Sequence, residues 1–224
     1  MRLSLGQLRT ALKIAAVACL GLCAESGAAA PRDSTRMKTA LVVGDSLSDG
    51  FRLPRTQAYP ALLATRLRKE GLNFKVMNAS ASGGTTASGL ARLAPHLRRK
   101  IDIFLLQLGI NDAFRGVPIP DIRANLQAMI DQAKKNHPNC AIVIVGMQLP
   151  VLTPDGYVRA FGEMYRELAD KNNAALVPYL LEGVGGDPAL NLPDRIHPNA
   201  AGQKILAENV WRVLEPIAQA VSKR

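Results

Sequence analysis

A carboxylate, a guanidinium and an imidazole lie within four positions of the run DRIHPN, residues 194–199. An aspartate beside a histidine can hold the imidazole in one tautomer, and such a histidine can deprotonate a hydroxyl nucleophile. The alternative is a polar turn that leads into a helix, with Asn199 as the N-cap and Pro198 in the entering segment. The catalytic interpretation requires a nucleophile elsewhere in the chain, which His197 would deprotonate while Asp194 orients its ring.

The run GDSLSDG, residues 44–50, offers that nucleophile in Ser46. Ser46 lies where an apolar segment passes into a helical one, and the free N–H groups at a helix start favour a developing negative charge. Serine is also common as a helix N-cap, which is the alternative for this position. The run is not the G-x-S-x-G turn of α/β-hydrolases, because Ser48 replaces the second glycine. Asp45 and Asp49 lack the lysine or metal cluster that a phosphate acceptor needs.

Two further loops carry groups that suit a developing oxyanion. The glycine-rich run at residues 78–89 does not match G-x-G-x-x-G, and Gly83 would let the backbone approach a substrate closely. After the next apolar run, the amide of Asn111 could donate to a tetrahedral oxyanion. The alternatives are a flexible loop around the glycines and an Asx turn at Asn111 or Asp112.

Together the four loops resemble the SGNH, or GDSL, hydrolase superfamily in the blocks VVGDSLSDGFRL, NASASGGTTASGLARL, LGINDAFRG and DRIHPNAAGQ. The strings are most similar to the subgroup of bacterial exported acyl-CoA thioesterase I, lysophospholipase and arylesterase enzymes. The resemblance runs from about Thr39 to Val221. Four blocks in order, each at a predicted strand end, are a far more specific signal than one block alone.

The resemblance implies the roles of five residues. Ser46, Asp194 and His197 match the catalytic residues of the superfamily. The backbone N–H groups of Ser46 and Gly83, with the side chain of Asn111, match its oxyanion hole. The chemistry agrees, because a serine hydroxyl is a poor nucleophile until a base within hydrogen-bond reach takes its proton. Neither a metal nor a cofactor is implied.

Two residues depart from the pattern of the superfamily, and both are expected to change the shape or charge of the substrate entrance. Ile110 replaces a glycine that is common in the asparagine block, and Arg195 replaces the glycine often found between the aspartate and the histidine. The loops 114–120 and 149–157 should border the site. Five apolar side chains in these loops could line a groove for an acyl chain or aryl ester, or they could only pack the loops against the domain. They are Phe114, Val117, Ile119, Val151 and Leu152.

The function implied is a serine esterase and thioesterase that hydrolyses aryl esters, acyl-CoA or lysophospholipids through an acyl-enzyme. One alternative is a carbohydrate O-deacetylase of the same superfamily. It would need exposed aromatic platforms, and the only tryptophan, Trp211, falls in the last helical pattern. The other alternative, a catalytically silent lipid-binding protein of the envelope, is disfavoured because Ser46, Asp194 and His197 are intact.

Short apolar segments alternate with helical patterns along the chain. Strands are predicted at residues 39–46, 74–80, 101–109, 140–147 and 174–180, and their continuous hydrophobicity is typical of a parallel sheet buried on both faces. Apolar residues at three- and four-residue spacing predict helices near 119–133, 157–168 and 206–221. Five such units predict an α/β fold, a three-layer α/β/α flavodoxin-like domain with a five-stranded parallel sheet. Ligands then bind beyond the carboxyl ends of the strands.

The beginning of the chain differs from the rest. Basic residues precede an apolar run at 14–24, and small residues follow it, as in a secretory signal peptide. The main alternative, a membrane-anchoring helix, would need a longer run. A lipoprotein signal ending at Cys19 or Cys23 is disfavoured by the residues before each cysteine. We therefore expect a signal peptide at 1–30, a single SGNH hydrolase domain at 31–224, and a periplasmic or secreted protein.

The chain of 224 residues is 48% hydrophobic and carries a formal charge of +10, which suits one globular domain. Its basic residues are scattered, with small clusters only at RLRK (66–69) and LRRK (97–100), both typical of the C-terminal ends of helices. We expect a small acyl ester or thioester as substrate, transient contact with an anionic membrane surface, no nucleic-acid partner and a monomer.

Beyond the expected signal peptide, Cys140 is the only cysteine, so no internal disulfide is possible there. Its place at the start of an apolar segment predicts a small buried hydrophobe rather than a nucleophile. The three histidines are far apart in the sequence and have no metal-ligand spacing.

Overall fold

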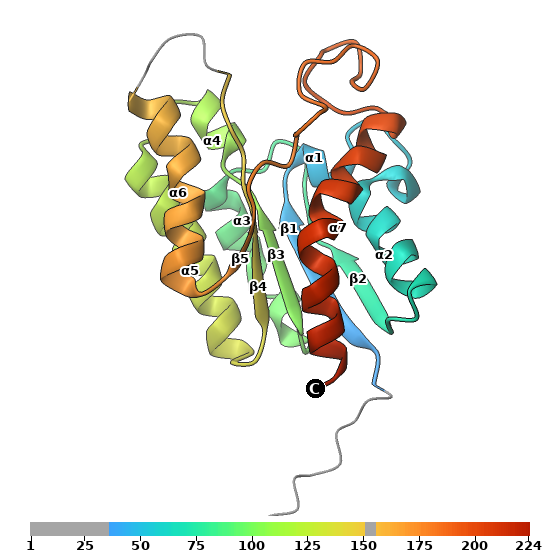
Figure 1. Cartoon of the computed structure of the whole chain (residues 1–224). Helices are drawn as coiled ribbons and strands as arrows, with labels where there is room; N and C mark the ends of the chain where they lie inside the picture. Colours follow the sequence, from blue (N-terminus) through green and yellow to red (C-terminus); the bar gives the residue numbers. More distant parts are fainter. Residues whose placement is uncertain (1–35, 151–155) are drawn as a thin grey trace, which may run out of the picture. The chain divides into compact units, whose positions relative to one another are not determined.

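The computed structural model describes residues 36–150 and 156–224, and a single parallel sheet lies at the centre of this part of the chain (Figure 1). Its strands are β1 (Lys38–Gly44), β2 (Phe74–Asn78), β3 (Ile103–Gln107), β4 (Ala141–Val145) and β5 (Ala175–Val177). Their order in the sheet is β2-β1-β3-β4-β5, with every neighbouring pair parallel. Each strand falls on a segment predicted as a strand, and the order is flavodoxin-like. The predicted α/β fold is confirmed.

Helices cover both faces of the sheet (Figure 1). One face carries α2 (Tyr59–Lys69) and α7 (Ala200–Ser222), and the other carries α3 (Thr86–Leu93), α5 (Ile119–Asn136) and α6 (Gly156–Asn172). Two short helices, α1 (Ser46–Asp49) and α4 (Ile110–Phe114), follow the ends of β1 and β3. The three layers match the prediction, and all five residues of β3 are buried between them.

The helix signals in the sequence are confirmed with one exception. The stripe predicted for α5 faces the core, and RLRK ends α2 in its last turn. LRRK does not end a helix of this kind. Helix α3 stops at Leu93, and the cluster begins in a 3₁₀ turn, His96–Arg98, that follows Pro95. Pro95 has no N–H to continue the α-helical ladder, which explains the early stop.

The carboxyl ends of β1 and β3 lie side by side and carry the loops of interest. The chain leaves β1 toward α2 on one face, whereas it leaves β3 toward α5 on the other face. Such a switch in direction opens a crevice at the strand ends, where ligands bind in sheets of this type. Within the described residues, no helix is long and apolar enough to cross a membrane.

Candidate active site

The turn after β1 presents Ser46 at the first position of α1. Asp45, and not Ser46, is the N-cap, because a carboxylate oxygen of Asp45 accepts the N–H of Leu47 at 2.9 Å. The N-cap alternative for Ser46 is therefore wrong. The Ser46 N–H, as the first of the helix, has no partner within the helix and points out of its positive end. Ser46 is 8% exposed, so it is largely buried at the end of the strand rather than displayed on the surface.

The segment before α7 brings a base to this serine. The Ser46 hydroxyl lies 2.9 Å from Nε2 of His197, and Nδ1 of the same ring lies 2.9 Å from Oδ2 of Asp194. The sequence predicted this pairing across about 150 residues. The other oxygen of Asp194 accepts the backbone N–H groups of Ile196 and His197, both at 3.0 Å. The N–H of His197 is the main reason that the pKa of Asp194 falls to about 2, so the carboxyl is ionised beside the imidazole.

The polar-turn interpretation of DRIHPN is confirmed, and it does not exclude the catalytic one. Asn199 caps α7 by accepting the N–H groups of Ala201 and Gly202 at 2.9 and 3.1 Å. The helix cap thus anchors the arm that carries the histidine. Arg195 adopts a left-handed backbone with φ of 61°. Because this conformation is easiest for glycine, it explains why a glycine suits the position that Arg195 occupies.

The glycine-rich loop after β2 lies against the nucleophile turn. The N–H of Ala81 donates to the carbonyl of Gly44 at 3.1 Å, and the Ser82 hydroxyl donates to Asp49 at 2.9 Å. Gly83 has φ of +73°, and a Cβ built there would meet open space. The position therefore requires glycine for its backbone angle and not for lack of space.

Asn111 reaches the same loop from α4. Its amide donates to the carbonyl of Gly84 at 3.0 Å, which uses one of its two N–H groups. Its neighbour Asp112 is buried and accepts the backbone N–H and the hydroxyl of Thr86, the latter at 2.6 Å. These side chains bind other segments instead of their own turn, so the Asx-turn alternative is wrong. Asp112 ties α4 to the start of α3 and so fixes where Asn111 points.

A buried polar network underlies the nucleophile turn, and sequence reasoning missed it. Gln107, at the end of β3, donates to Asp45 at 3.0 Å and accepts the Ser48 hydroxyl at 2.6 Å. The Ser48 hydroxyl also lies 2.8 Å from the hydroxyl of Tyr59. A Cβ at Gly44 would lie 2.5 Å from the Ser48 oxygen, so glycine is needed there. The sequence did contain a sign of this network, because Gln107 is a polar residue at the end of an otherwise apolar strand.

Burial controls the charge of this network. Asp45 is 0% exposed, and desolvation raises the pKa of its carboxyl from 3.8 to about 7, against the lowering effect of the N–H of Leu47 and the amide of Gln107. The negative charge of Asp112 raises it further. Burial likewise raises the pKa of Tyr59, whose hydroxyl stays protonated. Ser46 thus lies on a fully buried hydrogen-bonded network whose carboxyl, that of Asp45, holds its proton to a much higher pH than an exposed aspartate does.

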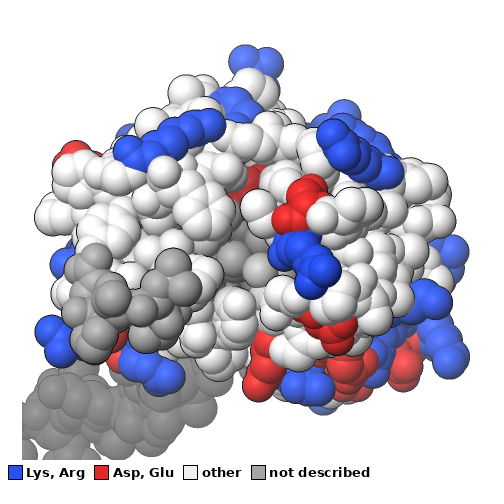
Figure 2. Space-filling model, turned by 90° about the horizontal axis from the view of Figure 1, so that it is seen from above, with Lys and Arg blue, Asp and Glu red and all other residues white. Residues whose placement is uncertain are grey.

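The rim of the crevice combines apolar and positive side chains. Phe114, at the end of α4, is 60% exposed and Ile196, beside the histidine, is 53% exposed. Val117 is only partly buried, Ile119 is buried in the core, and Val151 and Leu152 lie outside the described residues. Figure 2 views this end of the protein, and its Lys and Arg side chains are spread around the rim rather than gathered in one patch.

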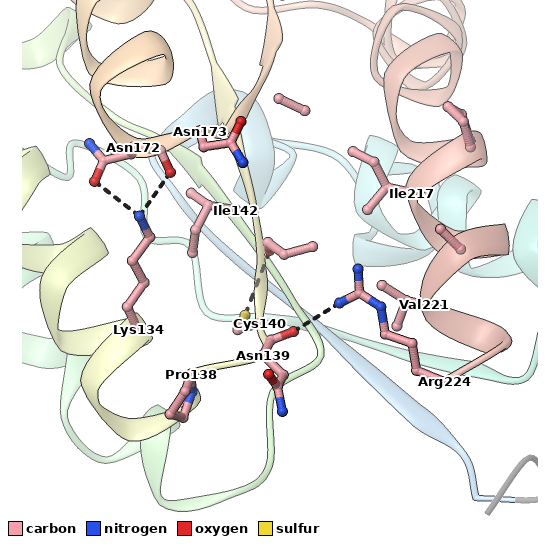
Figure 3. Close-up of a pocket in the computed structure, with 14 residues that line it drawn as sticks. Lys134, Pro138, Asn139, Cys140, Ile142, Asn172, Asn173, Ile217, Val221 and Arg224 are labelled. Atoms are coloured by element: carbon pink, nitrogen blue, oxygen red, sulfur yellow. Dashed lines mark hydrogen bonds between the residues drawn. The ribbon is translucent and has the colours of Figure 1, made fainter. Parts of the chain in front are cut away.

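A second hollow, of about 510 Å³, lies at the opposite end of the sheet (Figure 3). Lys134 donates to the carbonyl of Asn172 there at 2.8 Å, and Arg224 donates to the carbonyl of Asn139 at 3.3 Å. Burial raises the pKa of the Cys140 thiol to about 12, which makes it a buried hydrophobe as predicted. The hollow contains no base beside a nucleophile. In residues 36–150 and 156–224, no group of three or more His, Cys, Asp or Glu could hold a metal ion.

Known proteins resemble this chain over nearly all of its described residues. A family model described as the GDSL-like lipase/acylhydrolase family matches residues 42–205, which contain all four candidate loops. The esterase TesA of Pseudomonas aeruginosa is 41% identical over 181 residues, covering 80% of this chain and 89% of that protein. The crystal structure of TesA matches with a TM-score of 0.76 and 41% identity, covering 80% of this chain and 99% of that one.

Two further relatives carry related names. An arylesterase of Vibrio mimicus is 37% identical over 175 residues, covering 78% of this chain and 86% of that protein. The thioesterase 1/protease 1/lysophospholipase L1 of Escherichia coli is 33% identical over 180 residues, covering 80% and 84%. The similarity extends over most of each relative, so it concerns whole domains and not an isolated motif.

Proposed function

This chain belongs to the GDSL-like lipase/acylhydrolase family, and we propose that it hydrolyses carboxylic esters and thioesters through an acyl-enzyme formed on Ser46. The observation that carries the proposal is the chain of two 2.9 Å hydrogen bonds from Ser46 through His197 to Asp194. Within the described residues, no other serine or cysteine hydrogen-bonds to a histidine that a carboxylate orients.

The proposed reaction has two halves. Nε2 of His197 takes the Ser46 proton as the hydroxyl oxygen attacks the acyl carbon, and the same nitrogen then protonates the departing alcohol or thiol. In the second half, His197 takes a proton from a water molecule as that water attacks the acyl carbon, and it returns this proton to the Ser46 oxygen as the serine–acyl bond breaks and the carboxylic acid leaves. Asp194 holds the ring in the tautomer that leaves Nε2 free to accept, and it stabilises the imidazolium that forms.

Three donors are proposed to stabilise the tetrahedral oxyanion: the N–H groups of Ser46 and Gly83 and the second amide N–H of Asn111. The first N–H of that amide binds the carbonyl of Gly84, which holds the side chain in one orientation. Donors fixed in advance need no reorganisation as charge develops, and removing one such donor typically costs about 10²–10³ in kcat.

An acyl chain or an aryl group is the proposed substrate portion that contacts the rim. The exposed side chains of Phe114, at the end of α4, and Ile196, beside His197, favour apolar substituents on the substrate. The relatives named esterase, arylesterase and thioesterase/lysophospholipase support the same range of leaving groups. A carbohydrate deacetylase is less favoured, since Trp211 is 2% exposed and offers no platform for a sugar.

Covalent labelling tests the nucleophile. A fluorophosphonate probe should modify the wild-type protein on Ser46 alone, and Ser46→Ala should fold normally but neither react nor hydrolyse p-nitrophenyl acetate. Ser222→Ala, at the far end of α7, is the matched control and should keep both properties. Peptide mapping that placed the adduct on Ser48, Ser82 or Tyr157 would contradict the mechanism. Rates on p-nitrophenyl esters from acetate to palmitate, palmitoyl-CoA and lysophosphatidylcholine then rank the substrates.

We also propose that the protein is exported, that it acts as a monomer, and that it touches anionic membrane surfaces transiently. The composition of residues 1–30 supports export, and N-terminal sequencing should find a mature start between residues 25 and 32. A cytosolic protein that begins at Met1 would contradict export. Vesicles containing phosphatidylglycerol should bind the protein at low salt and release it at high salt, because charge attraction is screened.

A further inference from the structure

The short nucleophile helix ends in a way that determines where Phe51 lies. Gly50 adopts a left-handed backbone with φ of 80°, and the N–H groups of both Gly50 and Phe51 donate to the carbonyl of Ser46 at 3.1 Å. Terminations of this kind reverse the chain directly after a glycine. Because α1 has only four residues, the reversal returns Phe51 to the side of the nucleophile itself.

The ring of Phe51 packs against the proposed general base. Its centroid lies 4.3 Å from the centroid of the His197 imidazole, with the two planes inclined by 35°. The guanidinium of Arg52 lies 5.1 Å from the Phe51 centroid. Ser46 is therefore linked to His197 twice, once through its hydroxyl and once through its carbonyl, the N–H of Phe51 and the stacked rings.

The imidazole needs such support because its other contacts hold only its edges. Asp194 binds one ring nitrogen and Ser46 the other. The side chains of His197 and Asp194 are 20% and 31% exposed, so water can compete for both. A flat aromatic surface against one face of the imidazole restricts ring tilt and excludes water from that face.

We infer that Phe51 is a positioning residue for hydrolysis, and that its ring keeps Nε2 of His197 aimed at the Ser46 hydroxyl. This inference rests on the proposed function, since it concerns the same serine and histidine. Phe51 acts through the imidazole and not on the substrate. Its loss should therefore lower kcat and leave KM for a small neutral ester nearly unchanged.

Steady-state kinetics on p-nitrophenyl acetate test the inference with three substitutions. Phe51→Leu keeps an apolar side chain but removes the flat ring, and it should lower kcat about tenfold with KM within twofold. Phe51→Tyr restores the ring and should keep kcat within twofold of wild type. Phe74→Leu, which removes a partly buried ring at the start of β2, is the matched control and should leave kcat unchanged.

A spectroscopic measurement provides a readout that does not depend on activity or on a foldable variant. The carbon-bound protons of the His197 ring should resonate upfield in the wild-type protein, because the ring centroids lie only 4.3 Å apart and the planes are inclined by 35°. They should return toward ordinary positions in Phe51→Leu and stay upfield in Phe51→Tyr. Absence of the upfield shift in the wild type would overturn the inference even if Phe51→Leu failed to fold.

The kinetic outcomes separate the two proposals. If Phe51→Leu retained wild-type kcat while Ser46→Ala was inactive, the role of Phe51 would be wrong and the serine mechanism would stand. The role of Phe51 would also be wrong if Phe51→Tyr lost as much kcat as Phe51→Leu, or if only KM rose. Activity retained by Ser46→Ala would instead refute the proposed function, on which the role of Phe51 depends.

Discussion

Replacing Asp45 with asparagine should remove a pH dependence of stability that the wild-type protein shows between about pH 4 and pH 7. Burial raises the pKa of this carboxyl from 3.8 to about 7 in the folded protein. The folded state therefore binds the proton more tightly than the unfolded state does. The stabilisation is fully present below pH 3.8, and it is lost as the pH rises through about 7.

The expected magnitude follows from the size of the shift. One pKa unit corresponds to ~1.4 kcal/mol, so a rise from 3.8 to about 7 amounts to roughly 4 kcal/mol of lost stability across this range. Asparagine keeps a carbonyl oxygen for the N–H of Leu47 and cannot ionise. The amide of Gln107 must then turn so that its oxygen faces the new donor. The variant should thus behave like the wild-type protein with Asp45 protonated. Its free energy of unfolding, relative to that of the wild type, should increase with pH.

Urea unfolding of both proteins at pH 4.5, 6 and 8 measures this effect. Groups that titrate alike in the two proteins cancel in the difference between their free energies of unfolding. That difference should shift in favour of Asp45→Asn by a few kcal/mol between pH 4.5 and pH 8. Asp194→Asn is the control, because the pKa of Asp194 is shifted in the opposite direction, to about 2. The stabilisation by Asp194 is lost only as the pH falls below about 4, outside the range of this experiment. A flat difference for Asp45→Asn would refute the raised pKa of the buried carboxyl.

Three further predictions concern the division of roles within the site. Asp194→Asn should keep its oxygen for the N–H groups of Ile196 and His197 but present an amide to Nδ1, so kcat should fall by up to ~10⁴-fold with little change in KM; an effect on KM alone would contradict its orienting role. Asn111→Ala should lower kcat about 10²–10³-fold, because its amide meets an oxyanion that exists only near the transition state; unchanged kcat in steady-state assays would remove it from the oxyanion hole. Arg195→Gly should relieve a left-handed backbone that costs about 1–2 kcal/mol for a residue with a Cβ, so thermal stability should not fall. Its kcat on a neutral aryl ester should stay within a few-fold, while KM for an acyl-CoA rises at low salt and not at high salt; loss of neutral-ester turnover would show that Arg195 belongs to the catalytic machinery.

Local pattern was enough to predict the strands, the three layers and the ends of the loops that carry the site. Parallel strands buried on both faces are apolar throughout, so their positions were visible in the sequence. The carboxyl ends of such strands meet at one edge of the sheet. That is why Ser46, Gly83 and Asn111 could be expected near one another before any contact was known.

Tertiary structure decided which side chains cap, support and pack against the predicted residues. Asp45 and not Ser46 caps α1, because the carboxylate reaches the N–H of Leu47. Gln107 continues an apolar strand in the sequence, and only the pairing of β1 with β3 places its amide between Asp45 and Ser48. The contact of Phe51 with His197 likewise joins segments far apart in the chain.

The difference between what the sequence predicts and what the folded chain decides has a physical cause. Strand, helix and cap preferences depend on neighbours within a few residues, and those neighbours are printed in the sequence. A buried hydrogen bond or a ring stack depends instead on the distance between two segments, which the packing of the whole domain sets. The sequence alone therefore determined the chemical groups of the candidate site and the sheet edge that carries them. Only the folded chain decided that the carboxyl of Asp45 is buried and that the face of His197 is covered.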